Sequence, residues 1–518
     1  MSESRDELVQ TRRDKLARLR QSAVPTCPYA FARTHRIGEA LDRFDELVAQ
    51  GGAVSLAGRL MARRVMGKAS FGHVADDSGR IQVYLRRPEV GSGQDPAGYD
   101  LFRSAVDLGD WLGVEGVPMV TRTGERTVQV TSWTLLAKCL RPLPVVKEEA
   151  DSGQRHHQYS DPDERYRHRA MDLAVNPEER QVFRRRARLI QLMRRHLEER
   201  GFLEVETPAL QPLYGGGTAR PFVTFHNQLG RQLYLRIADE LYLKRLIVGG
   251  VERVYEICKD FRNEGVDRTH NPEFTMMECY AAFEDYTFMM GLVEQMVTTI
   301  VQEVHGSTAI PWLDGTLDFT PPWPRVRFFA ALQEQAGRDL RDADVTVLRA
   351  VARKLEVVVP AGAERGRLLE GLFAERVEPT FARPTFVVDY PLELSPLARR
   401  HRRDPRLVER FEAFAGGMEI ANAFSELNDP DEQRARFAEQ QRLRQAGDEE
   451  AMPLDEDYLG VLELGMPPTA GLGMGVDRLA MLLTNRQSIR DVVLFPLLRD
   501  RQAGGDNGAA RSGAAEGA

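Results

Sequence analysis

Residues Phe261 to Tyr280, "FRNEGVDRTHNPEFTMMECY", combine arginines, carboxylates, a histidine and aromatic side chains in one short segment. The segment has neither a Ser or Cys nucleophile beside a base nor a Cys/His spacing typical of a metal site. Arginine binds phosphate or carboxylate through paired hydrogen bonds, and attack on phosphorus by a substrate oxygen needs positioned charge rather than an enzyme nucleophile. The segment therefore indicates chemistry on a bound phosphate. For any single Arg–Glu pair, a structural salt bridge is the simpler explanation.

Two β-strands joined by a loop are predicted to carry these side chains, "RVYEICKDFRNE" and "PEFTMMECYAAF". Alternate residues of a strand face the same side, so Arg262 and Glu264 share one face of the first strand. Glu278 and Tyr280 share one face of the second. Together the strands are expected to form a charged working surface.

Two segments nearer the C-terminus carry further candidate ligands. In "FEAFAGGMEIANAFSELNDP", Glu412, Glu419 and Glu426 recur at intervals of seven, with Asn422 between them. Such carboxylates suit Mg²⁺ with its waters and phosphate oxygens, and they equally suit a cationic substrate. In "GLGMGVDRLAML", a glycine run lets the backbone approach a ligand before Arg478 begins a helical pattern. A glycine-rich turn with an ordinary surface arginine is the alternative.

The elements around these residues mix strands and helices without βαβ alternation, which predicts an α+β domain on a largely antiparallel sheet. The domain opens with a helix for which Asn176 is the predicted N-cap and Pro177 the first residue. Glu179 is predicted to complete a capping box, and Gly201 follows the helix end. The apolar stripe of the helix includes Val182, Leu189, Ile190, Met193 and Leu197.

Short alternating strands between Val54 and about Arg141 predict a small β-barrel. In "RIQVYLRR", one face is apolar and the other carries Gln82. In the preceding strand Phe71 and His73 share a face, and an exposed aromatic beside polar strand residues is how an OB-fold stacks unpaired bases. A buried Phe71 in the barrel core is the alternative, since most aromatic residues are buried.

The remaining segments complete the predicted organisation of the chain. Residues 7 to 20 form a helical pattern whose basic side chains either bind RNA phosphates or solvate a surface helix. "PVVKEEADSGQRHHQYSDPDE" is polar and turn-rich, as linkers are, and the tail has too few apolar residues to fold. We therefore predict a helical extension (1–50), a barrel (51–145), a linker (146–175), an α+β domain (176–500) and a disordered tail (501–518).

Length and composition agree with a multidomain globular protein. A chain of 518 residues exceeds one hydrophobic core, and its charged and hydrophobic fractions of 28% and 42% are ordinary. The formal charge of -7 argues against a uniformly basic nucleic-acid-binding protein but leaves local basic patches open. The four cysteines form no C-x-x-C pair, and the N-terminus has no apolar signal region. We therefore expect a cytoplasmic protein that does not span a membrane.

Three segments, "GFLEVETPALQP", "RVYEICKDFRNEGVDRTHNPEFTMMECY" and "GLGMGVDRLAMLL", resemble, in this order, the three motifs of class II aminoacyl-tRNA synthetases. Within that class the chain resembles bacterial lysyl-tRNA synthetases in "YGGGTARPF", "LYLRIADELYLKRLIVGG", "SPLARRHR", "ANAFSELNDP", "GMPPTAGLGMG" and "SIRDVVLFP". The resemblance covers about Val54 to Pro496. It implies an antiparallel class II sheet flanked by helices and an N-terminal five-stranded OB-fold barrel that binds the anticodon.

The resemblance also implies a reaction. Lysine and ATP would form lysyl-adenylate and pyrophosphate, and the lysyl group would then pass to the 3'-terminal adenosine of tRNA-Lys. Mg²⁺ would accompany ATP, with Glu412 and Glu419 as its expected ligands. The first motif builds the dimer interface in this class, so Gly201, Pro208 and the preceding helix imply a homodimer.

Individual roles follow from the same resemblance. The implied catalytic residues are Arg262, Glu264 and Arg478, with Arg262 bridging the lysine carboxylate and the α-phosphate. The implied ATP-binding residues are Arg262, Glu264, Arg268, His270, Phe274, Gly473, Gly475 and Arg478. The implied lysine-binding residues are Gly216, Glu240, Arg262, Glu278, Tyr280, Asn422, Phe424 and Glu426, of which Glu278, Tyr280 and Glu426 would take the ε-ammonium group. The implied anticodon-binding residues are Phe71, Gln82 and Glu125.

Two other functions are compatible with such a scaffold. A paralogue that lysylates a protein side chain typically lacks the barrel, which this chain retains. A catalytically silent RNA-binding protein would not need Arg262, Glu264 or Arg478. One departure from the pattern is Thr269, which stands next to His270 where many relatives have arginine.

Overall fold

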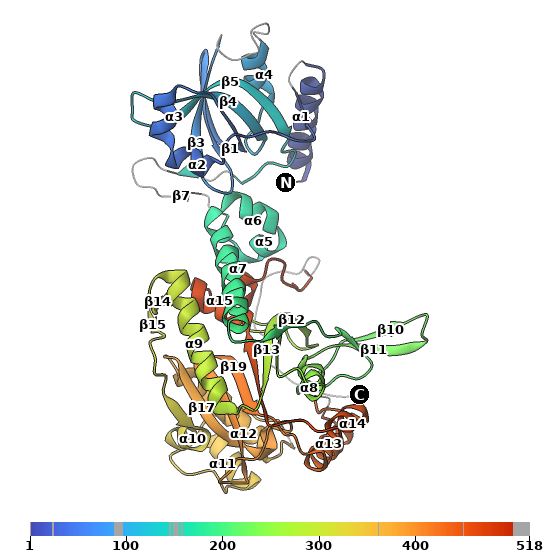
Figure 1. The fold of residues 1–518 in the computed structure, drawn as a ribbon. Coiled ribbons are helices and arrows are strands. Elements are labelled where there is room, and N and C mark those ends of the chain that lie inside the picture. The colour runs from blue at the N-terminus through green and yellow to red at the C-terminus, as the bar shows by residue number, and fades with distance from the viewer. Residues whose placement is uncertain are drawn as a thin grey trace. The chain divides into compact units, whose positions relative to one another are not determined.

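The structure is a computed structural model that describes residues 2–22, 25–87, 97–144, 147–148, 155–156, 159–360, 362–448 and 450–500. The chain divides into two compact units, Met1–Ser160 and Asp161–Ala518 (Figure 1). The tail predicted for residues 501–518 and much of the insert around residues 149–158 lie outside the described residues. Among the described helices, none combines the length and apolar character needed to cross a bilayer.

The first unit is built on a closed five-stranded barrel with strand order β1-β2-β3-β5-β4. Neighbouring strands are antiparallel except for the parallel pair β3 and β5. The apolar face predicted for β3 is confirmed, because Ile81, Val83 and Leu85 are almost fully buried in the barrel core. The strands are β1 (Val54–Met66), β2 (Ala69–Ala75), β3 (Arg80–Arg86), β4 (Trp111–Val120) and β5 (Arg126–Ala137).

Four helices accompany the barrel: α1 (Ser2–Arg20), α2 (Ile37–Asp42), α3 (Phe44–Gln50) and α4 (Ala97–Ala105). The predicted first helix is confirmed, and its basic face is partly used inside the unit. The Lys15 ammonium lies 2.6 Å from Asp107, and Arg12 donates a 3.1 Å hydrogen bond to the carbonyl of Leu108. These side chains attach α1 to the barrel unit, so they are not all free to meet solvent or RNA.

Part of the predicted linker is helical. Residues 162–175 form α5 (Pro162–Arg167) and α6 (Arg169–Val175), and a short ladder joins β6 (Lys147–Glu148) to β7 (Arg155–His156). Arg169 and Asp172 form a fully buried ion pair at 2.8 Å, and Arg165 also binds Asp172 at 2.8 Å. The polar composition that suggested a linker instead supplies internal ion pairs.

The long helix after this region is α7 (Pro177–Glu198), which begins at the predicted N-cap Asn176 and buries its predicted apolar stripe. The predicted capping box is wrong. The Asn176 amide donates to Asp172 at 2.7 Å, and this side chain forms no capping bond to the helix. The Glu179 carboxylate instead forms 2.8 Å ion pairs with Arg165 and Arg486, so tertiary pairing replaces local capping.

The second unit contains an eight-stranded sheet in the order β16-β17-β18-β19-β20-β13-β12-β8. Its pairs are antiparallel except at the two edges, where β16 pairs with β17 and β8 with β12 in parallel. The predicted α+β fold on a largely antiparallel sheet is confirmed. The strands are β8 (Leu203–Glu204), β12 (Arg253–Phe261), β13 (Glu273–Ala282), β16 (Arg325–Arg327), β17 (Thr385–Pro391), β18 (Leu407–Ala415), β19 (Met418–Ser425) and β20 (Thr469–Gly475).

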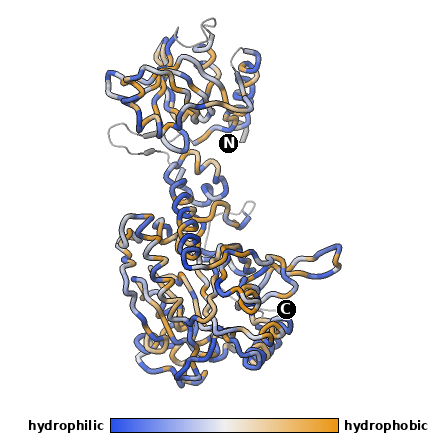
Figure 2. Tube along the Cα trace, viewed as in Figure 1, coloured by the Kyte–Doolittle hydropathy of each residue, from blue (hydrophilic) through white to orange (hydrophobic). Residues whose placement is uncertain are grey.

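Two cores form on opposite faces of this sheet. In β17, Phe386 and Val388 pack into one core, whereas Val387 packs into the other, as strand alternation requires. The first core also contains residues of α7, α9 (Tyr286–His305) and α15 (Val476–Thr484), and the second contains residues of α10 (Phe328–Ala336), α11 (Val345–Lys354) and α12 (Arg365–Arg376). Figure 2 shows hydrophilic and hydrophobic residues interspersed along the chain.

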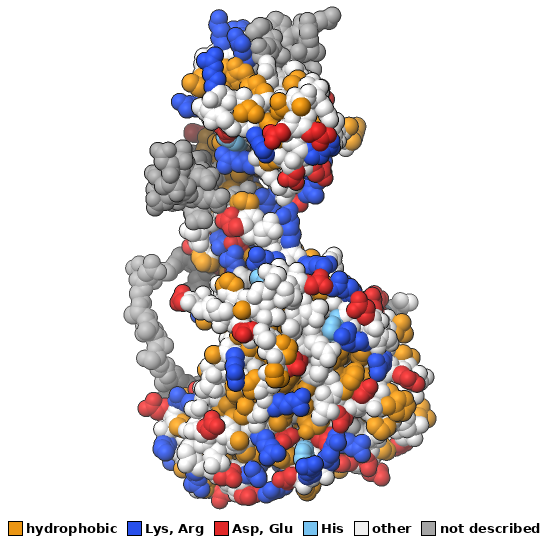
Figure 3. Space-filling model, turned by 60° about the vertical axis from the view of Figure 1, so that its left-hand side comes forward, with side chains coloured by type: hydrophobic (Ala, Val, Ile, Leu, Met, Phe, Trp, Pro, Cys, Tyr) orange, Lys and Arg blue, Asp and Glu red, His pale blue; other side chains and the backbone are white. Residues whose placement is uncertain are grey.

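The remaining elements surround the sheet. A separate small sheet, ordered β10-β11-β9, carries a hairpin that projects from the unit in Figure 1. On the face shown in Figure 3, side chains of both charge signs are interspersed over the surface. The remaining helices and strands of the second unit are β9 (Leu210–Gln211), β10 (Val223–His226), β11 (Arg231–Leu235), α8 (Glu240–Val248), β14 (Ala309–Trp312), β15 (Gly315–Asp318), η1 (Glu378–Thr380), η2 (Leu392–Leu394), α13 (Pro430–Gln445), α14 (Glu456–Leu462) and α16 (Ile489–Val492).

Candidate active site

A cleft of about 500 Å³ lies in the second unit, lined by residues of β13, β19 and β20, the loop after β12, and the start of α15. Most of the residues singled out from the sequence line it together. They are Gly216, Glu240, Arg262, Glu264, His270, Phe274, Glu278, Tyr280, Glu412, Glu419, Asn422, Phe424, Gly473, Gly475 and Arg478. Arg268 and Glu426 are the two predicted residues of this unit that do not line the cleft.

The glycine run forms strand β20 between β13 and β19, so it is not a turn. Gly471 lies opposite Tyr280 on one side and Phe424 on the other. A Cβ atom at position 471 would lie 2.0 Å from the Glu426 Oε1 atom and 2.4 Å from the Tyr280 ring. Only glycine therefore fits between these two side chains. Gly471 was not among the predicted site residues, although the glycine run contained it.

Strand β12 ends at Phe261, so Arg262 and Glu264 lie in the loop after it, and their predicted place on one strand face is wrong. Arg262 is held by its backbone and its side chain. Its N–H donates to the carbonyl of Pro272 at 2.9 Å, and its Nε donates to the carbonyl of Ile237 at 3.4 Å. The guanidinium carbon lies 5.1 Å from the centroid of the Phe274 ring, within cation–π range. A guanidinium held in this way can bind a phosphate or carboxylate through two hydrogen bonds.

Arg478 connects two other parts of the cleft. Its Nη1 donates to the Glu419 carboxylate at 2.9 Å, and its Nη2 lies 3.3 Å from the His270 Nε2 atom. The preceding residue, Asp477, fixes the start of α15 by accepting a 2.7 Å hydrogen bond from the Thr275 N–H on β13. The arginine is therefore part of the site and not an ordinary surface residue.

His270 belongs to a tight turn organised by Asp267. The Asp267 carboxylate accepts backbone hydrogen bonds from Thr269 at 2.7 Å and His270 at 2.8 Å. Burial acts to raise the pKa of Asp267, but these bonds and the His270 side chain outweigh it and lower the pKa to about 2. Arg268 points elsewhere, donating to Gln487 at 2.9 Å. The turn thus presents His270 to the cleft while Arg268 lies outside it.

Glu412 and Glu419 are two carboxylates that could hold a cation. Glu412 accepts a 2.8 Å hydrogen bond from Tyr390 and forms an ion pair with Arg410. Burial and then the nearby Glu419 raise the pKa of Glu412, although Arg410 opposes them. The two carboxylates lie close enough to repel each other, and their hard oxygens are the ligands that Mg²⁺ prefers. Arg410, which the sequence analysis missed, also donates to Asn422 at 2.9 Å.

A second group of acidic residues forms the other end of the cleft. The Tyr280 hydroxyl donates to the Glu278 carboxylate at 2.9 Å, and both side chains are buried. Gly216 has a φ of 84°, and a Cβ atom there would meet Glu240 at 3.0 Å and Ala238 at 3.1 Å. The chain therefore needs glycine at 216 to pass this close to Glu240. The arrangement provides acceptors for a cationic ligand.

Lys244 is a buried cation at this end of the cleft that the sequence analysis missed. Its ammonium group is fully buried and forms ion pairs with both Glu240 and Glu426. It also lies 5.4 Å from the centroid of the Phe424 ring. The four-residue spacing of Glu240 and Lys244 was the available sequence signal, but such pairs usually stabilise an exposed helix surface.

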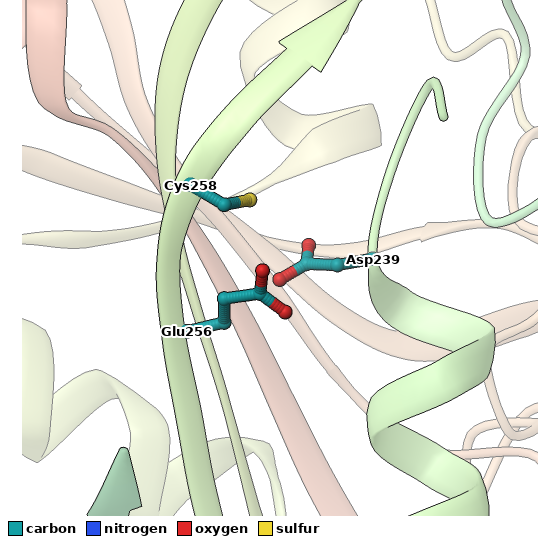
Figure 4. Close-up of side chains that lie close together, drawn as sticks. All are labelled: Asp239, Glu256 and Cys258. Atoms are coloured by element: carbon teal, nitrogen blue, oxygen red, sulfur yellow. The ribbon is translucent and has the colours of Figure 1, made fainter. Parts of the chain in front are cut away.

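Further acidic residues lie behind Glu278. Asp239 and Asp260 are fully buried, and one ligand oxygen from each of them and from Glu278 lies within 4.8 Å of the others. Glu256 and Cys258 project from β12 toward Asp239 at the start of α8 (Figure 4). In the sequence, Asp239 resembles an ordinary helix cap, because an acidic residue before a helix usually has that role.

The anticodon-site candidates lie together on the barrel of the first unit. Phe71 is half-buried outside the barrel core, and its ring centroid lies 4.8 Å from that of Tyr84. The buried-core alternative for Phe71 is therefore wrong. Gln82 donates to Glu125 at 2.5 Å, and His73 lies 2.7 Å from the same carboxylate. An aromatic pair and a polar group thus adjoin on one barrel face.

Comparison with known protein families defines the class. Residues 161–499 match the model described as tRNA synthetases class II (D, K and N), and residues 54–136 match the model described as an OB-fold nucleic acid binding domain. The first match spans well over half of the chain. The chain therefore belongs to the class II tRNA synthetases of this group, and the resemblance found in the sequence is confirmed.

The relatives of this chain share a name that is narrower than the class. Proteins named lysine–tRNA ligase match this chain from Roseiflexus castenholzii, 52% identical over 499 residues, and from Chloroflexus aurantiacus, 50% identical over 498 residues. Each match covers 96% of this chain and 99% of the relative. The protein of the same name from Pelotomaculum thermopropionicum is 48% identical over 503 residues, covering 96% of both chains.

Proposed function

We propose that this chain is a lysine–tRNA ligase, which activates L-lysine with ATP and transfers it to the 3'-terminal adenosine of tRNA-Lys. The near full-length identity to proteins of that name supports the proposal. The single structural observation that carries it is one cleft lined both by the buried acids Glu240 and Glu278 and by Arg262, His270 and Arg478. A cationic amino acid and a triphosphate need these opposite charges side by side.

The first step requires positioned charge and no enzyme nucleophile. A carboxylate oxygen of lysine attacks the α-phosphorus of ATP, forming the new O–P bond as the bond to the bridging oxygen breaks and pyrophosphate leaves. Arg262 can bind the lysine carboxylate and the α-phosphate together, which reduces their repulsion and aligns the attack. Asn422, held by Arg410 at 2.9 Å, is a further carboxylate contact.

The adenine and phosphate contacts are assigned to further residues that line the cleft. We assign the base to Phe274 and Arg478, with Glu264 accepting from the adenine amino group. His270 is assigned to the β- and γ-phosphates, and the backbone at Gly473 and Gly475 lines the same cleft. Arg268, which donates to Gln487, would have to leave that partner before it reached a phosphate.

Mg²⁺ is the cation that we assign to Glu412 and Glu419. Their proximity to each other and their hard oxygens fit this ion. When bound, it would neutralise phosphate charge on ATP. Arg410 keeps Glu412 in place, and Arg478 keeps Glu419 in place, whether or not the ion is present.

Lysine would be bound through both of its ammonium groups. We assign the α-amino group to Glu240 and the backbone at Gly216, and the ε-ammonium group to Glu278 and Tyr280 with Phe424 beside them. Glu426 belongs to the same acidic group but acts through Lys244, its partner in the pocket wall. Loss of one partner from a desolvated charge pair costs roughly 3–5 kcal/mol, which is enough to reject a neutral side chain.

The barrel is proposed to bind tRNA-Lys through its anticodon. Phe71 supplies a ring for base stacking, and Gln82 and Glu125 supply hydrogen-bonding groups. The protein is also proposed to be a homodimer. Large apolar side chains between residues 203 and 229 support this, because Phe225 and Leu229 are 59% and 60% exposed. Translation would place the enzyme in the cytoplasm, and the four free cysteines suit that compartment.

Lysine-dependent exchange of pyrophosphate into ATP tests the proposed activity, with ornithine and arginine alongside, followed by charging of tRNA-Lys. Glu278→Gln should reduce lysine activation by at least about 100-fold, because a buried ammonium group loses its ionic partner, while ATP binding persists. Glu273→Gln is the matched control, since Glu273 is an exposed residue of the same strand and does not line the cleft. No lysine-dependent exchange by the unmodified protein would refute the proposal.

A further inference from the structure

Asp239 and Glu278 form a carboxyl pair at the back of the amino-acid pocket. Asp239 lies just before α8, and Glu278 lies on β13. Asp239 is fully buried, and Glu278 is 6% exposed. An oxygen of each carboxyl group lies within 4.8 Å of the other, and both Asp239 oxygens are buried without a hydrogen-bond donor among the described residues. Because a carboxylate has no proton to donate, the two groups can satisfy each other only when one is protonated, with Glu278 donating and Asp239 accepting.

Two of the nearby cations, Arg236 and Lys244, already pair with other carboxylates. Arg236 donates to Glu256 at 2.8 Å and lies 3.4 Å from Asp260. Lys244 forms ion pairs with Glu240 and Glu426. The titratable and charged groups around the pair are Arg236, Glu240, Lys244, Glu256, Cys258, Asp260, Arg262, Tyr280 and Glu426.

Two ionised carboxylates cannot both be stable in this position. Burial penalises each charge, and like charges this close repel strongly where water is excluded. Burial and the neighbouring Asp260 raise the pKa of Asp239 to about 8. Burial and then Asp239 raise the pKa of Glu278 well above the ordinary range. The pair therefore holds a proton at neutral pH.

We propose that Asp239 is a positioning residue for the amino-acid pocket: it shares one proton with Glu278 in the free enzyme, and this proton is released when the substrate's side-chain ammonium group binds. The inference rests on the proposed lysine activity and adds a residue and a proton to it. The ammonium group arrives protonated, since its pKa in solution is about 10.4. It replaces the shared proton as the positive partner of the pair, and the displaced proton passes to solvent.

This exchange keeps the charge of the pocket constant. One positive charge leaves as a proton and one enters as the ammonium group, so the pair and its cation carry one net negative charge in both the free and the bound pocket. A neutral side chain cannot make the exchange, because it offers no charge to replace the proton. Asp239 thus contributes to selection of a cationic amino acid without touching it.

Calorimetric titration with lysine in two buffers of different ionisation enthalpy tests the proposal. At pH 7 the wild-type protein should release about one proton for each lysine bound, and its Kd should fall by up to about tenfold for each unit of pH increase. In Asp239→Asn, the like charge of Asp239 is gone and the amide can donate to Glu278, so the pKa of Glu278 should fall, although burial still raises it. This variant should therefore release less proton for each lysine bound than the wild type, and its Kd should depend less steeply on pH.

Two further variants separate this role from a structural one. Asp239→Glu restores a carboxyl group and should restore proton release. Cys258→Ala removes a side chain that neighbours Asp239 but leaves every carboxyl group in place, so it should behave as the wild type. A thermal unfolding scan shows which variants are folded. Asp239 has no side-chain capping bond to α8, so its replacement by asparagine should not cost the helix a cap.

Specific results would overturn the proposal. Lysine binding by the wild type without proton release would refute the shared proton and leave the ligase activity standing. Equal proton release by the wild type and Asp239→Asn would refute the role of Asp239. Proton release that appears only after treatment with a chelator would show that a metal ion, held by the carboxylates of Asp239, Asp260 and Glu278, takes the place of the proton. No lysine binding at all would refute both the proposed function and this inference.

Discussion

Glu426 forms a buried ion pair with Lys244, a lysine that belongs to the protein itself. The same ammonium group pairs with Glu240, so one resident cation serves two of the acidic residues assigned to the substrate. The charge of the pocket is therefore partly balanced in the ligand-free protein. In the proposed assignment, an incoming ammonium group meets Glu278 and Tyr280, which are hydrogen-bonded to each other and have no ion pair to Lys244.

Replacement of Lys244 by methionine should impair both folding and activity. The change keeps most of the volume but leaves Glu240 and Glu426 as buried acids without their cation. Breaking a buried pair in this way costs about 3–5 kcal/mol of unfolding free energy. Urea unfolding measures that loss, and pyrophosphate exchange should show lysine activation reduced by at least about 100-fold.

Lys259→Met is the matched control for Lys244→Met. Lys259 lies on β12, is 40% exposed, and is 3.6 Å from Glu273. A surface pair of this kind contributes about 0–1 kcal/mol, so this variant should unfold and react almost as the wild type does. Equal destabilisation by the two substitutions would show that the buried ion pair contributes no more to the unfolding free energy than the surface pair does.

Replacement of Gly471 by alanine should close the lysine end of the cleft. The new methyl group would lie 2.0 Å from the Glu426 Oε1 atom and 2.4 Å from the Tyr280 ring, so both side chains must move. Lysine KM should rise by about tenfold or more, because a displacement of this size disrupts ligand positioning. ATP binding, measured by fluorescence titration, should change little. Gly460→Ala is the control, since a Cβ atom there meets nothing within 4 Å.

The buried acids predict how stability depends on pH. The pKa is raised to about 8 for Asp239 and about 6 for Asp260, in both cases first by burial, whereas an unfolded aspartate titrates near 3.9. Between these values the folded protein binds more protons than the unfolded chain, so its unfolding free energy must fall as pH rises. Urea unfolding should show a decline of this free energy from about pH 4 to 8. Asp239→Asn should flatten it, and an unchanged slope would contradict the assigned pKa.

The strand positions of the site could be predicted because they depend on local periodicity. Residues two apart on a strand share a face, and this rule alone predicts that Glu278 and Tyr280 lie together. The same rule identified the buried face of β3. Motif order then connected segments hundreds of residues apart, which periodicity alone cannot do.

Buried charges could not be predicted in the same way. Lys244 and Asp239 look like ordinary polar residues of a helix and its start, and only the packing of α8 against β13 shows that they are buried with Glu278. Arg169 and Asp172 fall in the predicted linker for the same reason. The capping box is wrong because Glu179 has tertiary partners. In each case a charged residue looks solvated in the sequence because its partners lie elsewhere in the fold.

An exposed apolar side chain on the hairpin of β10 and β11 predicts that the hairpin is part of the proposed homodimer interface. Phe225 on β10 is 59% exposed, and a large apolar side chain of this kind is typical of an interface anchor. Phe225→Asp should convert the proposed homodimer to monomers at micromolar concentration, as measured by sedimentation velocity. Leu464→Asp, at a residue 79% exposed elsewhere in the unit, should leave the dimer intact. A wild-type protein that sediments as a monomer would refute the dimer itself.

Because the barrel is proposed to bind the tRNA anticodon, a change on its surface should affect tRNA charging and leave lysine activation unchanged. Phe71→Ala removes a ring that lies 4.8 Å from Tyr84, and loss of base stacking costs about 1–3 kcal/mol. The kcat/KM for charging of tRNA-Lys should therefore fall by roughly tenfold or more, while lysine-dependent pyrophosphate exchange stays unchanged, because that step needs no tRNA. Tyr29→Ala is the control, since Tyr29 is a fully exposed aromatic of the same unit and lies outside this face. Equal loss of both activities would assign Phe71 to barrel stability, and unchanged charging would remove it from the RNA-binding surface.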